Sequence, residues 1–243
     1  MRRKQIYLFL LFVFLIVVSI STIEVNAMHT GFEITELPSE EKELFISNIN
    51  VLSIDEEPAK KTIKCFDVNG DQLIAIGQNT SNRKTICVYS NKGVFQYGYT
   101  FNCTGDFGVE WDGKNLNIYF VRSSVIVSVS PKGEVLGAFE VENTIDNNSY
   151  INHFFHTTKR TIGKDEYLIG NNMGLLNFFA TSYSQIIVKD STGFENVIYD
   201  VGSMYLTKMI VTISLVCVFV LIAIAVVFWQ FIKLRRSNQG TVL

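Results

Sequence analysis

The hydrophobic residues between positions 109 and 141 fall into four short runs separated by turn residues. VEW ends at Asp112-Gly113, a pair that suits the positive φ of a tight reversal. LNIYFV and VIVSVS follow, and they are rich in the β-branched and aromatic residues that favour strands. Pro131-Lys132-Gly133 then separates VIVSVS from VLGAFEV. The pattern predicts a small antiparallel sheet of four strands.

The same pattern recurs on both sides of this stretch. In residues 63–101, the turn pairs Asn69-Gly70 and Lys92-Gly93 stand 43 and 40 residues before their counterparts in the central stretch. Residues 160–201 repeat the pattern less regularly, with Gly193 at the place of the second turn. A period near 40 residues with about four strands per unit is typical of β-propeller blades.

The segments FGVEWDGKNLNIYFV and VIVSVSPKGEVLGAFEV resemble the blades of NHL-type and TolB-like β-propellers. The resemblance covers residues 63–141 closely and residues 160–201 loosely. It implies an all-β outer domain over residues 63–205, built of three to four propeller-like blades. A generic antiparallel meander with glycine turns is the alternative interpretation, because these motifs encode turns and strands and no chemistry.

The number of repeats bears on whether the blades close into a ring. Propellers typically have about four to eight blades, whereas three repeats are recognisable here. An open array leaves a sheet edge with unpaired amides and carbonyls. The candidate edges are residues 46–54, predicted to be a strand, and residues 194–201. We expect these two segments to pair or to approach each other within the chain; pairing with a second copy or another protein is the alternative.

Both ends of the chain carry apolar runs. Residues 1–27 begin with Arg2-Arg3-Lys4 and continue with an apolar run, the layout of a signal peptide cleaved after Ala27 or of an uncleaved anchor. Residues 206–232 contain an uncharged run of 21 residues, long enough for a transmembrane helix. Residues 233–243 form a basic tail. The basic residues predict cytoplasmic ends and place residues 28–205 outside the cell membrane.

Residues 28–62, between the first apolar run and the repeats, are acidic and irregular. The segment EEKELF is predicted to form a short helix, and Ser39 is positioned to cap it through its hydroxyl. Residues 28–205 together hold 22 acidic and 14 basic residues, a net charge of −8. Binding of nucleic acid requires clustered Lys and Arg, so this charge excludes a nucleic-acid partner.

The cysteines allow at most one disulfide in the outer domain. Cys217 lies in the C-terminal apolar run, which leaves the odd set of Cys65, Cys87 and Cys103. No CxxC spacing is present, which argues against zinc and thioredoxin-like chemistry. Buried strand thiols that act as small apolar residues are the alternative to a disulfide.

Other candidate residues do not combine into a recognised site. His153 and His156 lie in NHFFHTT, which we interpret as strand or loop, and no HExxH motif is present. The DVNGD segment from Asp67 to Asp71 has the wrong spacing for a calcium loop and predicts a hairpin turn. No serine lies in a GxSxG motif. Strand alternation is expected to separate Asp106, Glu110 and Asp112. The sequence therefore predicts no catalytic, metal-binding or cofactor-binding residues; three sequons begin at Asn79, Asn102 and Asn147.

We interpret the chain as a single-pass membrane protein whose outer domain is a protein-binding or accessory module, with the membrane and a protein as its partners. Propeller-like repeats present loops suited to recognition. The alternative is a membrane-tethered hydrolase or lyase with its site on the central face. An enzyme should gather titratable residues from several repeats around one pocket. A third interpretation is an accessory protein that acts mainly through its membrane helix.

Overall fold

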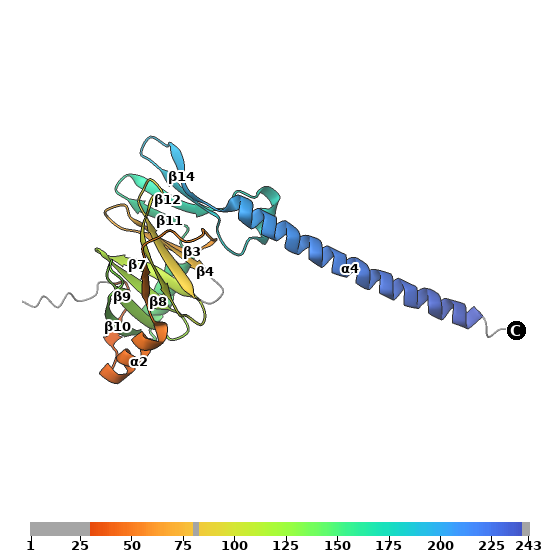
Figure 1. Cartoon of the computed structure of the whole chain (residues 1–243), viewed down its shortest axis with the longest axis horizontal. Helices are drawn as coiled ribbons and strands as arrows, with labels where there is room; N and C mark the ends of the chain where they lie inside the picture. The colour runs from red at the N-terminus through yellow and green to blue at the C-terminus, as the bar shows by residue number, and fades with distance from the viewer. Residues whose placement is uncertain (1–29, 80–82, 240–243) are drawn as a thin grey trace, which may run out of the picture.

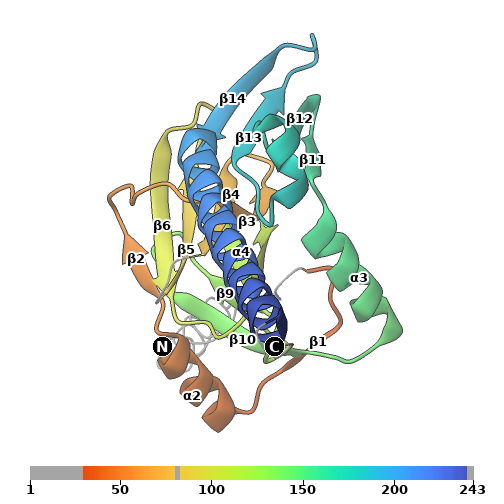
Figure 2. The ribbon, with the colours of Figure 1, turned by 90° about the vertical axis from the view of Figure 1, so that its right-hand side faces the viewer.

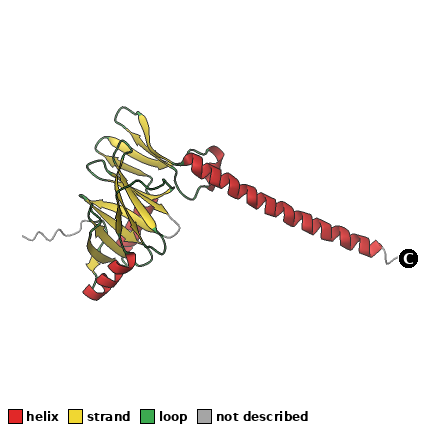
Figure 3. Cartoon of the chain, viewed as in Figure 1, coloured by secondary structure: helices red, strands yellow, loops and turns green. Residues whose placement is uncertain are grey.

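The computed structural model describes residues 30–79 and 83–239. The predicted signal peptide or anchor, residues 1–27, lies outside the described residues. The described chain forms a mostly β domain followed by one long C-terminal helix, as Figures 1 and 3 show.

Three antiparallel sheets correspond to the three predicted repeats. In each sheet, four consecutive strands pair with their sequence neighbours, as the turn pattern predicts. The first sheet contains β3 (Ile63–Val68), β4 (Ile74–Asn79), β5 (Lys84–Tyr89) and β6 (Phe95–Phe101). The second contains β7 (Phe107–Asp112), β8 (Asn115–Phe120), β9 (Val125–Val129) and β10 (Val135–Val141). The third contains β11 (Lys159–Ile162), β12 (Asp165–Gly170), β13 (Gln185–Lys189) and β14 (Glu195–Asp200).

Two short N-terminal strands extend the outer edges of two sheets. β1 (Ile34–Glu36) pairs with β10 of the second sheet, and β2 (Leu52–Ile54) pairs with β6 of the first. The predicted pairing of residues 46–54 with residues 194–201 is therefore wrong, because β2 pairs with β6. The sheets do not form a closed propeller within the described chain.

The segment before β2 is helical where a strand was predicted. α2 (Ser39–Ile49) includes the predicted EEKELF helix and continues into the first residues of 46–54. Its N-cap position is Pro38, and no side chain caps it, so the predicted role of Ser39 is wrong. Asn50 ends the helix in the left-handed conformation, with φ of 45°. Only three residues of the predicted strand remain extended as β2.

The first sheet is buried on both faces. One face packs against the second sheet in a core that includes Ile86, Phe101 and Val127. The other face packs against the third sheet through residues such as Ile76 and Tyr199. Because side chains alternate between faces along a strand, neighbouring residues of β4 and β5 enter different cores. The sheets are therefore stacked in the order third, first, second.

A helix covers the outer face of the second sheet. α3 (Ile145–His156) carries the chain from the second sheet back to the third, as Figure 2 shows. Phe154 of α3 packs with Phe32 and Tyr119 in a third apolar cluster. The Thr144 hydroxyl caps the helix by accepting from the Asn147 N–H at 3.2 Å. The interpretation of NHFFHTT as strand or loop is therefore wrong, since His153 and His156 fall within α3.

The three repeats share one turn. Gly93, Gly133 and Gly193 have φ of 74°, 85° and 85°, which a residue without a Cβ adopts without steric cost. Each of these glycines closes a turn, because its N–H donates to the carbonyl three residues earlier, at Ser90, Ser130 and Asp190. The predicted correspondence of the three glycines is confirmed in these φ angles and hydrogen bonds.

The long helix α4 (Gly202–Gln239) follows the third sheet almost directly. Only Val201 separates it from β14, and the Asp200 carboxylate accepts from the Gly202 N–H at 2.6 Å. The most apolar stretch within Gly202–Gln230 has a mean hydropathy of 3.2, and none of that stretch is buried. The helix contains the predicted membrane segment and is long and apolar enough to span a bilayer.

Candidate functional site

Polar side chains gather where the first strands of the three sheets approach one another. The Asp67 carboxylate on β3 accepts from Arg160 Nε on β11 and from the Trp111 N–H on β7, both at 2.8 Å. The Trp111 ring N–H donates to the Asp67 carbonyl at 3.3 Å. The Arg160 guanidinium also lies 5.5 Å from the centre of the Phe66 ring. One largely buried carboxylate thus joins strands of all three sheets.

Glu110, the neighbour of Trp111 on β7, connects this cluster to α3. Its carboxylate accepts from the Tyr150 hydroxyl on α3 and from the Thr30 hydroxyl, the latter at 2.6 Å. Burial, together with the hydrogen bond to Glu110, raises the pKa of Tyr150 above the usual range for a tyrosine. The phenol therefore stays protonated and donates a hydrogen bond to Glu110. The carboxylate thereby holds α3 against the second sheet.

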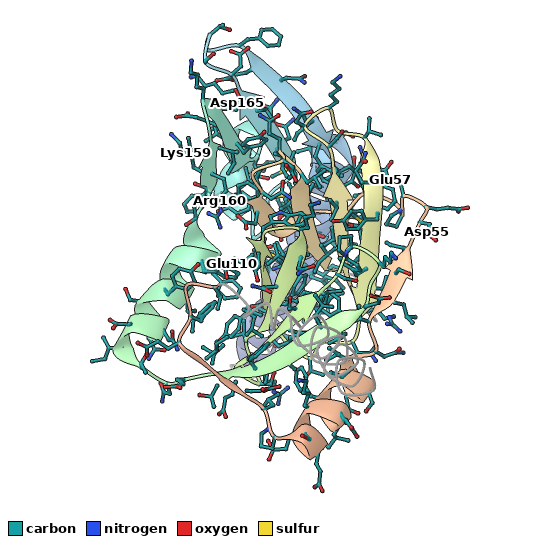
Figure 4. All side chains as sticks on the ribbon, turned by 90° about the vertical axis from the view of Figure 1, so that its left-hand side faces the viewer. Asp55, Glu57, Glu110, Lys159, Arg160 and Asp165 are labelled. Atoms are coloured by element: carbon teal, nitrogen blue, oxygen red, sulfur yellow. The ribbon has the colours of Figure 1, made fainter. Side chains whose placement is uncertain are left out.

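A pocket of about 280 Å³ lies beside these groups. Figure 4 shows Glu110, Lys159 and Arg160 on the side of the molecule that carries α3. The pocket is lined by Asp67, Glu110, Tyr150, Phe154, Thr157, Lys159, Arg160 and Thr161. It therefore gathers titratable residues from all three repeats, the arrangement expected of the enzyme alternative.

The carboxylates of the cluster are already engaged in hydrogen bonds within the protein. Both oxygens of Asp67 and both oxygens of Glu110 already accept hydrogen bonds from the protein. Lys159 pairs with Glu166 on the neighbouring strand at 2.5 Å. Among the described residues, no three His, Cys, Asp or Glu side chains are placed to hold a metal ion. We conclude that the carboxylates connect the sheets to one another and to α3.

A signal for this cluster is present in the repeat itself. Asp67, Glu110 and Arg160 each lie three residues before the glycine of the first turn in their unit, which is Gly70, Gly113 or Gly163. Equivalent positions of stacked repeats lie near one another, so aligning the first turns of all three units predicts the convergence. Alignment of the third unit by Gly193 alone does not reveal it.

Two other acidic residues, Asp106 and Asp112, lie near the ends of β7. Asp106 precedes β7 and lines a different pocket with Lys64, whereas Asp112 ends β7. The expected separation by alternation is wrong for Glu110 and Asp112, which are two residues apart in β7 and share a face. The DVNGD segment forms the turn between β3 and β4, as predicted, and the Asn69 side chain accepts from the Leu73 N–H at 2.8 Å.

The sequon at Asn147 is part of the fold. The Asn147 side chain accepts from the Glu33 N–H at 2.8 Å and donates to the carbonyls of Glu33 and Glu142. The residue is only 2% exposed. Its amide fastens the start of α3 to the N-terminal segment, so the folded chain does not present this sequon for glycosylation.

All four cysteines are free thiols. Cys65 and Cys87 are buried in strands, which confirms the interpretation of these two as small apolar residues rather than disulfide partners. Burial raises the pKa of both thiols to about 12. Cys103 is only half-buried, and partial burial raises its pKa as well.

We expect Cys65 and Cys87 to resist alkylation in the folded protein. With a pKa of about 12, only about one thiol in ten thousand is ionised at pH 8, and the thiolate is the reactive form. Iodoacetamide treatment of the full chain in detergent, followed by peptide mass spectrometry, should modify Cys103 faster than either. In denaturant all three should react fully. Rapid labelling of Cys65 or Cys87 in the folded chain contradicts the burial.

The same thiols make the free energy of unfolding fall as pH rises in the alkaline range. Their folded-state pKa lies above the ordinary value of 9.0, so the unfolded chain releases these protons first as pH rises. Their contribution to stability is complete below pH 9 and is lost as pH rises toward 12.

The outer edge of β14 differs from the corresponding edges of the other sheets. β6 and β10 each receive a three-residue strand from the N-terminal segment, whereas no described strand pairs with the outer edge of β14. Near α4, the Gly93 turn closely approaches the Ile198 carbonyl, since a Cβ added at Gly93 would lie 2.5 Å from its oxygen. The exposed part of the edge is therefore residues 195–197. We refer to these three residues as the open edge.

Comparisons with known proteins give no relative. No family model, curated protein or solved structure matches the chain. The resemblance to NHL-type and TolB-like blades therefore stays a prediction, and function has to be argued from the polar cluster and the open edge.

Proposed function

We propose that this chain is a membrane-anchored protein-binding module, and that a partner protein adds a short strand to the open edge of β14. The observation that carries the proposal is that the outer edges of the three sheets differ in whether a fifth strand pairs with them. Two of the three accept a fifth strand from the chain itself. The third has no fifth strand among the described residues. Strand addition is an established mode of peptide recognition, in which backbone hydrogen bonds supply affinity.

The length and surroundings of the open edge suit a modest interaction. β1 and β2 are each three residues long, so three residues suffice for this type of addition. Each backbone hydrogen bond contributes only about 1 kcal/mol net, and side chains must supply the rest. Val197 in the open edge and Phe194 just before it are exposed, and they offer apolar contacts to a partner.

The proposed location is the cell membrane, with residues 28–205 outside and the C-terminal tail in the cytoplasm. The long apolar helix α4 supports a single span, and the basic residues after it favour the cytoplasmic side. Confinement of a partner to the same membrane raises its effective concentration near the open edge. A weak strand addition is then sufficient for occupancy.

The enzyme alternative has one observation in its favour, the convergence of Asp67, Glu110, Lys159 and Arg160 on one pocket. Binding is preferred because these groups are paired with one another, with α3 or with a neighbouring strand. The unused hydrogen-bonding groups of the open edge need no rearrangement to engage a partner.

The test is site-specific photo-crosslinking in membranes of the source cells. A photoreactive amino acid replaces Val197 in β14 or, as the matched control, Leu136 in β10. The two side chains are 48% and 52% exposed, but β10 already carries an added strand, β1, which pairs with it at residues 139–141, three residues beyond Leu136. We expect position 197 to give a discrete adduct that maps to an extended segment of another protein. In a second experiment the photoreactive amino acid replaces the neighbouring Asn196. Val197→Lys should then reduce crosslinking from position 196, whereas Leu136→Lys should not.

Three outcomes count against the proposal. Equal adducts from positions 197 and 136 indicate nonspecific proximity. An adduct of twice the chain mass assigns the open edge to a second copy. The absence of any adduct at position 197 indicates that no strand is added.

A further inference from the structure

The segment between β12 and β13 exposes apolar side chains next to the start of α4. It contains the short 3-10 helix η1 (Gly174–Phe179). Leu175, Phe178 and Phe179 of η1 are 96%, 89% and 60% exposed. The two phenylalanine rings lie edge to face, 5.4 Å apart. We call these three side chains the apolar tip.

Polar side chains hold the segment in a conformation that leaves its apolar side chains exposed. Asn177 accepts from the Met173 N–H at 2.9 Å and donates to the Asn171 carbonyl at 3.1 Å. Asn171 in turn donates to the Ser182 carbonyl at 3.0 Å. Met173 is buried and anchors the segment. Amide groups thus stabilise the backbone from within, and the apolar side chains are left on the outside.

The segment is also fixed to α4. The Tyr205 hydroxyl in the first turn of α4 accepts from the Thr181 N–H, just after η1, at 3.1 Å. Figures 1 and 2 both show the short helix, in teal, beside the first turns of α4. This hydrogen bond connects the segment that carries the apolar tip to the first turn of α4.

The length of α4 gives the height of the apolar tip. The uncharged run from Met209 to Trp229 has 21 residues, about 31 Å of helix at 1.5 Å per residue, close to the thickness of a hydrocarbon core. Tyr205 precedes Met209 by four residues, or about 6 Å. The layer of polar headgroups on each side of the core is of this thickness. With α4 across the bilayer, Tyr205 and the adjoining η1 lie at headgroup level.

From these observations we infer that the apolar tip inserts into the outer leaflet of the membrane beside α4, as a second, shallow anchor. The inference rests on the membrane span in the proposed function and is independent of strand addition at β14. Transfer of water-exposed apolar area into lipid lowers the free energy, and Phe and Leu are among the residues that interfacial segments insert at the boundary between headgroups and acyl chains. Two attachment points restrict the tilt of the β domain over the membrane.

The test uses the full chain in phosphatidylcholine proteoliposomes. Trp229→Phe first removes the tryptophan at the far end of the span, Trp111 of the β domain contributes the same background to every variant, and Phe178→Trp then places a probe in the apolar tip. The matched control is Phe194→Trp, at a residue that is 68% exposed but lies at the β13–β14 turn, the end of β14 away from α4. We expect lipids brominated in the upper acyl chain to quench the fluorescence at position 178, with a blue-shifted emission, and to leave position 194 unchanged.

The two failures are distinguishable. Equal fluorescence of the two probes, with Trp229 of the unmodified chain quenched by the same lipids, overturns the shallow anchor and leaves the span intact. An unquenched Trp229 overturns the span, and the shallow anchor falls with it. Crosslinking at Val197 addresses strand addition separately. A triple replacement of Leu175, Phe178 and Phe179 by serine should increase hydrogen exchange of residues 174–179 in the proteoliposomes, since lipid no longer shields them.

Discussion

Replacing Asp67 by alanine is expected to lower the free energy of unfolding by about 3 kcal/mol, because a half-satisfied buried ion pair costs that much. The change leaves Arg160 without its carboxylate and the Trp111 N–H without its acceptor. Both groups lie where the three sheets meet. For a domain of this size the loss corresponds to a fall in Tm of roughly 6–12 °C, measurable by circular dichroism of the full chain in detergent.

The control for this prediction is an ion pair that differs mainly in exposure. Lys159 and Glu166 pair at 2.5 Å on the surface of the third sheet. Glu166→Ala is expected to leave Tm nearly unchanged, because exposed pairs are screened by solvent. Asp67→Asn retains one acceptor oxygen and should lose less than Asp67→Ala. Equal effects of Asp67→Ala and Glu166→Ala contradict the role of Asp67 in joining the sheets.

Replacing Gly93 by valine is expected to be at least as damaging, for a different reason. A Cβ at Gly93 meets the carbonyl oxygen of Ile198 at 2.5 Å, and φ is +74°. Strain at positive φ costs about 1–2 kcal/mol, and overpacking a rigid contact adds about 1–3 kcal/mol. The second contribution arises because the contact lies between the first and third sheets, and neither backbone can move alone. The Tm of the full chain should fall by more than for any other turn glycine.

The repeat supplies its own controls for this prediction. Gly193 has φ of +85°, and a Cβ added there would have no neighbouring atom within 4 Å, so its substitution by valine should cost only the strain. Gly133 falls between the two, because an added Cβ would approach that of Ser53 to 3.1 Å. The expected order of Tm loss is Gly93, Gly133, Gly193. An order in which Gly193 is most sensitive means that the contact between the sheets is not limiting.

The strands and their turns could be predicted from the sequence because their causes are local. A glycine at positive φ and the β-branched residues beside it specify a reversal within a few positions. Gly93, Gly133 and Gly193 illustrate this, and all three repeats were located from such signals. The open edge also lies within residues 194–201, one of the two candidate edges.

The helix α3 could not be predicted in this way. Its sequence mixes aromatic and polar residues without a clear helical period, and NHFFHTT fits a strand equally well. Distant contacts stabilise the helix: Asn147 binds the backbone of Glu33, and Phe154 packs on the second sheet. Tertiary contacts of this kind commonly override local propensity.

Ring closure was wrong for a related reason. The prediction assumed that residues 46–54 remain free to meet β14, but β2 pairs with β6, the last strand of the first repeat. Strand partners separated by about fifty residues are not specified by local pattern. The polar cluster could not be predicted from local pattern for the same reason, since Asp67 and Arg160 lie 93 residues apart.

The direct junction of β14 with α4 has a consequence for how the domain faces its neighbours. An α-helix turns by one revolution in 3.6 residues, and Val201 alone separates it from the strand. With α4 across the bilayer, the rotation of the helix about its own axis at Gly202 therefore sets the direction, within the membrane plane, in which the open edge faces. The open edge also begins within about 20 Å of the helix, given about 3.3 Å per strand residue. A partner that adds a strand to this edge, as proposed, would approach in the plane of the membrane, from one side and close to the lipid surface.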